Sequence, residues 1–155
     1  MKVGKAAEIL LVDDNESDRE LALHALKSGR VANTIHIARD GAEALDFIFA
    51  RGAFEYRRTY DLPHVILLDL KLPRISGVEV LKNLKSEPRT QMIPVIMLTS
   101  SQEDSDIAVC YRLGVNSYIV KPVDFQQFTE RLSSIGMYWM AFNQPPPIGR
   151  IDGGI

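Results

Sequence analysis

Reactive residue types follow four of the short apolar segments of this 155-residue chain. A pair of carboxylates follows the first segment, a single carboxylate the second, a pair of hydroxyls the third and an ammonium group the fourth. If the four segments are parallel strands, these groups meet at one edge of a sheet. The residues, in chain order, are Asp13 and Asp14, Asp69, Thr99 and Ser100, and Lys121.

A cluster of this kind suits phosphoryl chemistry with a metal ion. Two carboxylates ~4 Å apart repel each other by about 4 kcal/mol at an effective dielectric constant of about 20, and a hard cation removes that repulsion. Oxygen ligands suit Mg²⁺, which binds one or two carboxylates together with phosphate oxygens. Lys121 then supplies a point charge for a phosphoryl group, and Thr99 a neutral donor. A carboxylate can itself be the nucleophile, and Asp69 is the candidate because of its central position.

Each of these residues has an ordinary structural interpretation when it is taken alone. An aspartate after a strand commonly caps a helix or stabilises a turn, and the hydroxyls of Thr99 and Ser100 can do the same. The combination is harder to explain in this way, because four separate strand ends each carry the required residue type. Polar groups that gather in a cleft are functional-site candidates, so the combination favours a site.

The elements that position these residues follow from hydrophobic periodicity. Continuous apolar runs predict strands covered on both faces, and apolar residues three and four apart predict helices. Ser17 with Glu20 predicts a capping box at the first helix, and Asp124 with Gln127 predicts the cap of the last helix. The predicted strands are 8–12, 35–37, 65–68, 95–98 and 117–120, and the predicted helices begin near 17 and span 41–51, 78–86, 103–113 and 124–135.

Strands that alternate with helices predict an α/β fold with a doubly wound, five-stranded parallel sheet and helices on both faces. Right-handed crossovers favour the strand order 2-1-3-4-5 of flavodoxin-like folds, in which ligands bind outside the carboxyl ends of the strands. We expect one domain over residues 7–142, with a long Tyr- and Arg-rich connection over 52–63. Residues 143–155, which are rich in proline and glycine, are expected to form a disordered tail.

The composition excludes several classes of protein. The chain is 46% hydrophobic and 25% charged, which is typical of a soluble domain. No apolar run approaches the ~20 residues that span a bilayer, and no secretion signal is recognisable, so we expect no membrane partner and a cytoplasmic location. A single cysteine, Cys110, agrees with a reducing compartment. The net charge of -2 gives no basic footprint for nucleic acid.

Taken together, the motifs resemble the receiver domain of response regulators in two-component signalling. The resemblance covers roughly residues 7–135, and the motifs are specific as a set although each is short. The matching segments are 10–15 (LLVDDN), 67–73 (LLDLKLP), 76–77 (SG), 98–100 (LTS) and 120–122 (VKP).

The resemblance implies a role for each residue of the cluster. Asp69 would accept a phosphoryl group from a phosphohistidine, Lys121 would pair with the phosphoryl oxygens, and Mg²⁺ would be the cofactor. The implied metal ligands are Asp14, Asp69 and the backbone carbonyl of Lys71, with Asp13 acting through a coordinated water. Thr99 would move to the phosphoryl group with help from the N–H of Ser100, Tyr118 would turn inward as the switch, and the Lys121–Pro122 bond would be cis.

The implied function is that of a stand-alone signalling phosphoacceptor, which is phosphorylated by a sensor histidine kinase and acts through contacts with an unidentified target. The alternative is a relay intermediate that passes the phosphoryl group to a histidine phosphotransfer protein. A phosphatase of the haloacid dehalogenase type would carry an aspartate where this chain has Lys71, and the glycine-rich nucleotide-binding motifs are missing from the sequence. Too few residues follow Ile135 for a DNA-binding domain, so we expect output through protein contacts.

A narrower resemblance is to the small regulators that pair with phytochrome-type histidine kinases. It rests on the connection over 52–63, the segment over 122–128 and the aromatic extension after residue 135.

The aromatic extension also predicts a partner surface. The last helix is expected to bury an apolar stripe, and the aromatic and methionine residues that follow it would be exposed on a monomer. We therefore expect a homodimer on the face formed by the fourth helix, the fifth strand and the last helix; the alternative is that the extension folds back onto its own domain. The stripe is Phe125, Phe128, Leu132 and Ile135, and the extension contributes Met137, Tyr138, Trp139, Met140 and Phe142.

Overall fold

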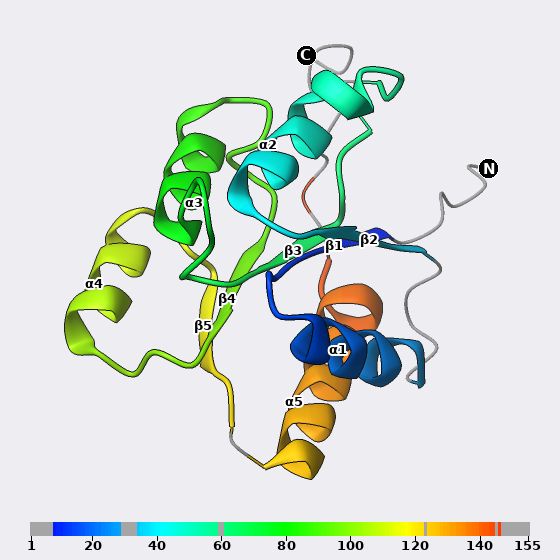
Figure 1. Ribbon diagram of the computed structural model, residues 1–155, viewed down its shortest axis with the longest axis vertical. Helices are drawn as coiled ribbons and strands as arrows, with labels where there is room; N and C mark the ends of the chain where they lie inside the picture. Colours follow the sequence, from blue (N-terminus) through cyan, green and yellow to red (C-terminus); the bar gives the residue numbers. More distant parts are fainter. Residues whose placement is uncertain (1–7, 29–33, 59–60, 123, 145, 147–155) are drawn as a thin grey trace.

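A parallel sheet of five strands forms the centre of the molecule (Figure 1). The computed structural model describes residues 8–28, 34–58, 61–122, 124–144 and 146. The strands lie in the order β2-β1-β3-β4-β5, which confirms the predicted topology. Their bounds are Glu8–Val12 (β1), Thr34–Ala38 (β2), Val65–Leu68 (β3), Val95–Thr99 (β4) and Ser117–Val120 (β5).

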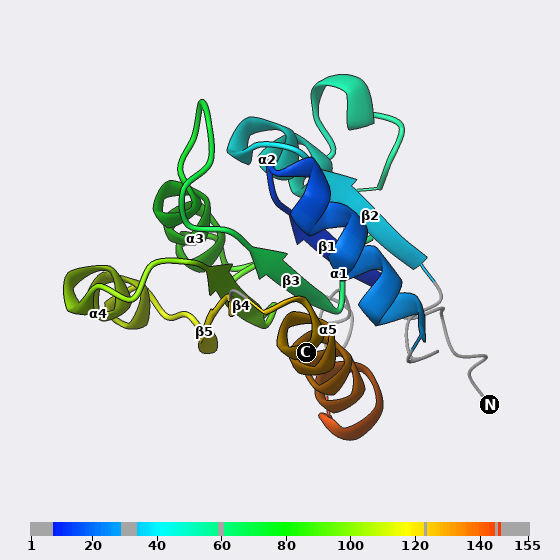
Figure 2. The same cartoon turned by 60° about the horizontal axis from the view of Figure 1, so that its bottom comes forward.

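Helices cover both faces of the sheet (Figure 1, Figure 2). α1 and α5 pack side by side on one face, where Ser133 Oγ donates a hydrogen bond to Ala25 O at 3.2 Å. α2, α3 and α4 lie on the other face. Among the described helices, none is long and apolar enough to cross a membrane. Their bounds are Glu16–Ser28 (α1), Gly41–Phe49 (α2), Gly77–Ser86 (α3), Asp104–Arg112 (α4) and Phe125–Met137 (α5).

The two faces of the sheet carry separate hydrophobic clusters, because successive side chains of a strand point to opposite faces. Leu10 and Ile66 belong to the cluster that includes residues of α2, α3 and α4. Ile9 and Leu67 belong to the cluster that includes residues of α1 and α5. All four side chains are buried. Burial on both faces explains why the strands read as continuous apolar runs, and it holds the strand ends in a fixed register.

Short polar side chains cap the helices that follow the strands. Asp40, Ser76 and Asp124 each accept hydrogen bonds from backbone N–H groups two or three residues further on, which confirms the predicted cap of the last helix. The predicted capping box at Ser17 is wrong. α1 begins at Glu16, and Asn15 is its cap, because the Asn15 side chain already accepts the N–H of Asp18 at 2.9 Å.

The apolar stripe of α5 is shorter than predicted. Phe128 and Leu132 are buried, and Ile135 packs against the same cluster. Phe125, in contrast, is 58% exposed, so its predicted burial is wrong. Phe125 is the first residue of α5, and this first turn lies beyond the ends of the strands (Figure 1).

The aromatic extension folds back in part onto its own domain. After α5 the chain continues as a short π-helix, η2 (Tyr138–Phe142). Trp139 and Met140 pack against the cluster between the sheet and the α1–α5 layer, whereas Tyr138 is 50% exposed. The predicted disorder of 143–155 falls largely outside the described residues.

The described start of the connection, residues 52–58, is tied to α2 although most of its residues are exposed. It contains a 3-10 helix, η1 (Gly52–Phe54). The guanidinium of Arg57 lies 3.6 Å from the centre of the Phe47 ring, and its Nε donates to Phe47 O at 3.1 Å. Cation–π and hydrogen-bonding contacts thus fix this segment against α2.

Gly77 sets how closely α3 approaches the end of β3. Its N–H donates to Leu70 O at 2.7 Å. A Cβ atom at this position would lie 2.1 Å from the backbone oxygen of Asp69 and 2.8 Å from Leu70 Cα. Only glycine permits this approach, so Gly77 helps to position Asp69.

We expect Gly77→Ala to lower the free energy of unfolding by about 3 kcal/mol, because the added methyl group must push the backbone after β3 away from α3. Urea denaturation measures the change. Lys82→Ala, an exposed position on the same helix, is the control and should stay within about 0.5 kcal/mol of wild type. Equal stability of the two variants would contradict the close approach.

Candidate functional site

Three carboxylates meet at the carboxyl edge of the sheet. One oxygen from each of Asp13, Asp14 and Asp69 lies within 4.8 Å of the others. The strand ladder continues into these residues, since Asp69 N donates to Val12 O at 3.0 Å and Asp13 N donates to Ala38 O at 3.1 Å. β1 and β3 are neighbouring strands, so the aspartates that follow them lie close together. The predicted convergence of the three aspartates is confirmed.

The Lys121 ammonium lies among these carboxylates. Its Nζ is 2.8 Å from Asp13 Oδ2, 2.8 Å from Asp18 Oδ2 and 3.5 Å from Asp69 Oδ2. The Lys121 side chain is only 9% exposed. Burial by itself lowers the pKa of Lys121, but the hydrogen bonds to Asp13 and Asp18 and the charge of Asp69 raise it above the ordinary value. Lys121 is therefore charged and is the local counter-ion of the site.

Lys121 does not neutralise the cluster. Burial raises the pKa of Asp69, the attraction of Lys121 opposes this, and the charge of Asp13 raises the pKa further. The result is a pKa above the ordinary value, which means that the site destabilises one of its own negative charges. Oxygen donors in such a cluster fit a hard divalent cation such as Mg²⁺.

The predicted hydroxyl residues lie at the end of β4. Thr99 is buried, and its Oγ1 accepts the N–H of Ser101 at 3.3 Å, while Ser100 is exposed. Tyr118 is half-buried, and its hydroxyl donates to Ser101 O at 3.0 Å. Thr99 and Tyr118 are therefore linked through the backbone of Ser101.

The segment after β5 departs from prediction in one respect. Lys121 N donates to Thr99 O at 2.7 Å, so the segment still follows β4 at this point. The predicted cis bond before Pro122 is wrong for this structure, because no peptide bond between described residues is cis. Trans is the commoner form of an X–Pro bond, and with it the Lys121 side chain reaches the carboxylates of Asp13, Asp18 and Asp69.

Two residues of the site were missed from the sequence. Asp18 lies in the first turn of α1 and binds Lys121, and Arg19 Nη1 donates to Asp13 O at 3.0 Å. Their position just after the Asp13–Asp14 pair was the available signal, because the first turn of a helix that follows β1 lies beside the carboxyl edge of the sheet. The contact between Asp18 and Lys121 spans 103 residues, and local periodicity cannot reveal it.

Comparison with known proteins agrees with this geometry. The family model described as the response regulator receiver domain matches residues 9–133. The chain is 36% identical over 138 residues to the probable methanogenesis regulatory protein FilR2 of Methanothrix harundinacea, across 89% of this chain and 86% of that protein. It is 35% identical over 132 residues to the response regulator Rcp1 of Synechocystis, across 85% of this chain and 88% of Rcp1.

Solved structures show the same similarity. The Mn²⁺-bound form of Rcp1 superposes with a TM-score of 0.84 at 34% identity and covers 90% of this chain and 99% of that one. The phosphorylated cyanobacterial phytochrome response regulator RcpA superposes with a TM-score of 0.86 at 34% identity and covers 92% of this chain and 99% of that one.

We expect Lys121→Ala to lower the free energy of unfolding by about 3 kcal/mol, because it leaves the buried Asp13 carboxylate without its counter-ion. Urea denaturation in the absence of divalent metal measures the loss. Arg74→Ala is the control: it breaks the pair between Arg74 Nη2 and Asp40 Oδ1 at 3.0 Å, in which the arginine is well exposed, and should cost much less. Equal losses in the two variants would show that Lys121 is not the counter-ion of a buried charge.

Proposed function

The chain belongs to the response regulator receiver domain family, and we propose that it is a stand-alone regulator that accepts a phosphoryl group on Asp69 from a sensor histidine kinase. The observation that carries the proposal is the meeting of Asp13, Asp14 and Asp69 at one edge of the sheet, with the Lys121 ammonium against Asp13 and Asp69. The phosphorylated form of the similar regulator RcpA supports it.

The transfer step requires a nucleophile and a leaving group. A carboxylate oxygen of Asp69 attacks the phosphorus of the donor, and an O–P bond forms while the donor's N–P bond breaks. The electron pair of that bond stays on the histidine nitrogen, which takes up a proton from water as the ring leaves. Lys121 then pairs with a phosphoryl oxygen, and Thr99 Oγ1 and the N–H of Ser100 donate to the others.

A divalent cation is part of this proposal, and the donor set of the site fits one. Asp14, Asp69 and the backbone carbonyl of Lys71 would hold Mg²⁺, with Asp13 acting through a coordinated water. When bound, the ion neutralises negative charge on the phosphoryl group that is transferred. The Mn²⁺-bound form of Rcp1 supports the choice of a divalent metal.

The signal leaves the site through Thr99 and Tyr118. When Thr99 turns toward the phosphoryl group, its hydrogen bond with the N–H of Ser101 is lost. The Tyr118 hydroxyl is bonded to the same residue, at Ser101 O, so its position changes with Thr99. Tyr118 then moves inward and alters the surface formed by α4, β5 and α5.

The partner kinase is of the phytochrome type in this proposal. The similarity to RcpA, over 92% of the chain, supports this pairing. Onward transfer to a histidine phosphotransfer protein is the alternative function, and nothing in the described part of the chain favours it.

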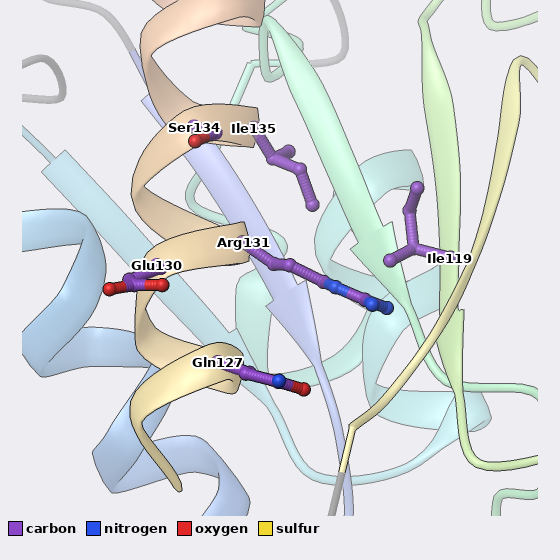
Figure 3. Close-up of a pocket in the computed structure, with 6 residues that line it drawn as sticks. All are labelled: Ile119, Gln127, Glu130, Arg131, Ser134 and Ile135. Atoms are coloured by element: carbon purple, nitrogen blue, oxygen red, sulfur yellow. The ribbon is translucent and has the colours of Figure 1, made fainter. Parts of the chain in front are cut away.

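We also infer that the protein forms a homodimer through α5 and β5. A groove of about 400 Å³ lies between these elements (Figure 3). Arg131 reaches from α5 toward β5, and its Nη1 donates to Val120 O at 3.0 Å. Tyr138 follows Arg131 and Ser134 at helical spacing and is half exposed, so an aromatic ring extends this face. The groove is lined by Ile119, Gln127, Glu130, Arg131, Ser134 and Ile135.

We expect the protein to gain one phosphoryl group when it is incubated with Mg²⁺ and a small acyl phosphate, as measured by intact mass. Asp69→Asn keeps the shape of the side chain but removes the nucleophile, so this variant should gain none. A phosphoryl group on Asp69→Asn would contradict the assignment of the acceptor.

The metal requirement is tested in the same assay. Asp14→Ala, or wild type with EDTA, should show no phosphorylation, while the circular dichroism spectrum of the variant stays that of a folded protein. Undiminished phosphorylation in either case would refute the role of Mg²⁺ at this site.

The homodimer is tested by light scattering coupled to gel filtration, with and without phosphodonor. Tyr138→Lys places a charge on the proposed interface and should convert the dimer to a monomer. Tyr56→Lys is the control, because Tyr56 is also exposed but follows η1 beside α2. Wild type that is monomeric at high concentration in both states would overturn the proposal.

A further inference from the structure

Asp18 makes a contact that the roles assigned above do not use. Its Oδ2 lies 2.8 Å from Lys121 Nζ, as close as Asp13 Oδ2 and closer than Asp69 Oδ2 at 3.5 Å. The residue stands in the first turn of α1, outside the group of three carboxylates that lie within 4.8 Å of one another. Lys121 thus makes one of its two short contacts with a residue that has no part in the metal site.

The hydrogens of Lys121 are already in use in this state. An ammonium group has three donors and no acceptor. Two of them point to carboxylates at 2.8 Å, and the contact with Asp69 at 3.5 Å is at the limit of a hydrogen bond. A phosphoryl group on Asp69 brings more negative charge and strong acceptor oxygens. A phosphoryl oxygen on Asp69 would therefore share the positive charge of Lys121 with two carboxylates, and loss of one of these contacts would strengthen its bond to the ammonium.

Asp18 is the partner that can release Lys121 at the lower cost. The Asp13 side chain is only 4% exposed, and its Oδ1 is held by the N–H of Asn15 at 2.9 Å. The Asp18 side chain is 30% exposed, so water can hydrate its carboxylate after release. Its place in the first turn of α1 also favours a negative charge, because the helix dipole places partial positive charge at this end of the helix.

We propose that Asp18 is a positioning residue that draws Lys121 away from Asp69 in the resting protein and competes with the phosphoryl group for the Lys121 ammonium. The proposal rests on the proposed function, since it takes Asp69 as the acceptor. A competitor of this kind weakens the apparent affinity of the site for a phosphoryl group. The site binds at full strength only in the fraction of molecules in which Lys121 is free of the competitor. Release of Lys121 also frees the first turn of α1 from the segment that follows β5.

The probe is beryllium fluoride, a stable analogue of a phosphoryl group on a carboxylate, titrated in the presence of Mg²⁺ by calorimetry. Asp18→Asn keeps the size of the side chain but removes the charge that holds Lys121. We expect it to bind beryllium fluoride about three to ten times more tightly than wild type, because a charge-assisted hydrogen bond to the competitor is replaced by a weaker neutral one. Asp18→Glu keeps a charged competitor and should bind within about twofold of wild type.

Glu16→Gln is the matched control. Glu16 is the other acidic residue in the first turn of α1, and it is exposed. Its substitution changes the net charge and the helix terminus in the same way as Asp18→Asn, and it should alter the affinity by less than about twofold. A gain in affinity that is confined to Asp18→Asn therefore comes from the contact with Lys121. It does not come from the change in net charge at the start of α1.

An NMR measurement supplies a second readout that a purely structural role would not move. In wild type, beryllium fluoride should shift the backbone amide signals of Asp18 and Arg19, because the carboxylate of Asp18 loses its partner. In Asp18→Asn these shifts should be smaller.

The proposal is overturned if Asp18→Asn binds beryllium fluoride as wild type does or more weakly, or if Glu16→Gln gives the same gain. These results leave the acceptor role of Asp69 intact. If wild type with Mg²⁺ neither binds beryllium fluoride nor gains a phosphoryl group, the proposed function fails and the competition fails with it.

Discussion

Lys121 contributes the one ammonium group that contacts Asp13, Asp18 and Asp69 within the described part of the chain. Asp14 adds a further carboxylate to the same edge of the sheet. Negative charge therefore exceeds positive charge in a partly buried place, where electrostatic interactions are stronger than in water. The fold tolerates this imbalance because its two apolar clusters hold the strand ends rigidly, and the unfavourable charge makes the edge receptive to a cation.

Strand order decides which groups can take part. β1 and β3 are neighbours, so Asp13 and Asp69 are close through backbone geometry alone. β5 is separated from β3 by β4, and a group on β5 must reach past the end of β4. The long stem of Lys121 allows this, and Thr99, a small residue, stands at the end of the intervening strand. The Lys121 ammonium consequently comes within reach of both Asp13 after β1 and Asp69 after β3.

The features that could be predicted from the sequence are those that depend on residues close together along the chain. The apolar runs of the strands, the cap at Asp124 and the aspartates after β1 and β3 are of this kind. The features it missed depend on contacts made in the folded chain. Asp18 meets Lys121 across 103 residues, and Phe125 has the right spacing for burial but lies beyond the strands that would cover it. The start of α1 was misplaced because Asn15 and Ser17 are almost equivalent caps, and the path of the chain after β1 selects between them.

The hydrogen bond from Arg131 to Val120 O also bears on how the protein remains in solution. β5 is an edge strand of the sheet. The backbone groups on the outer side of an edge strand can pair with a strand of another molecule, and repeated pairing produces an open-ended sheet. The guanidinium occupies one of these carbonyl groups and places a positive charge beside the strand, which disfavours open-ended growth of the sheet. Loss of this side chain would therefore expose the purified protein to slow aggregation at high concentration, even though neither the acidic edge nor the hydrophobic core would have changed.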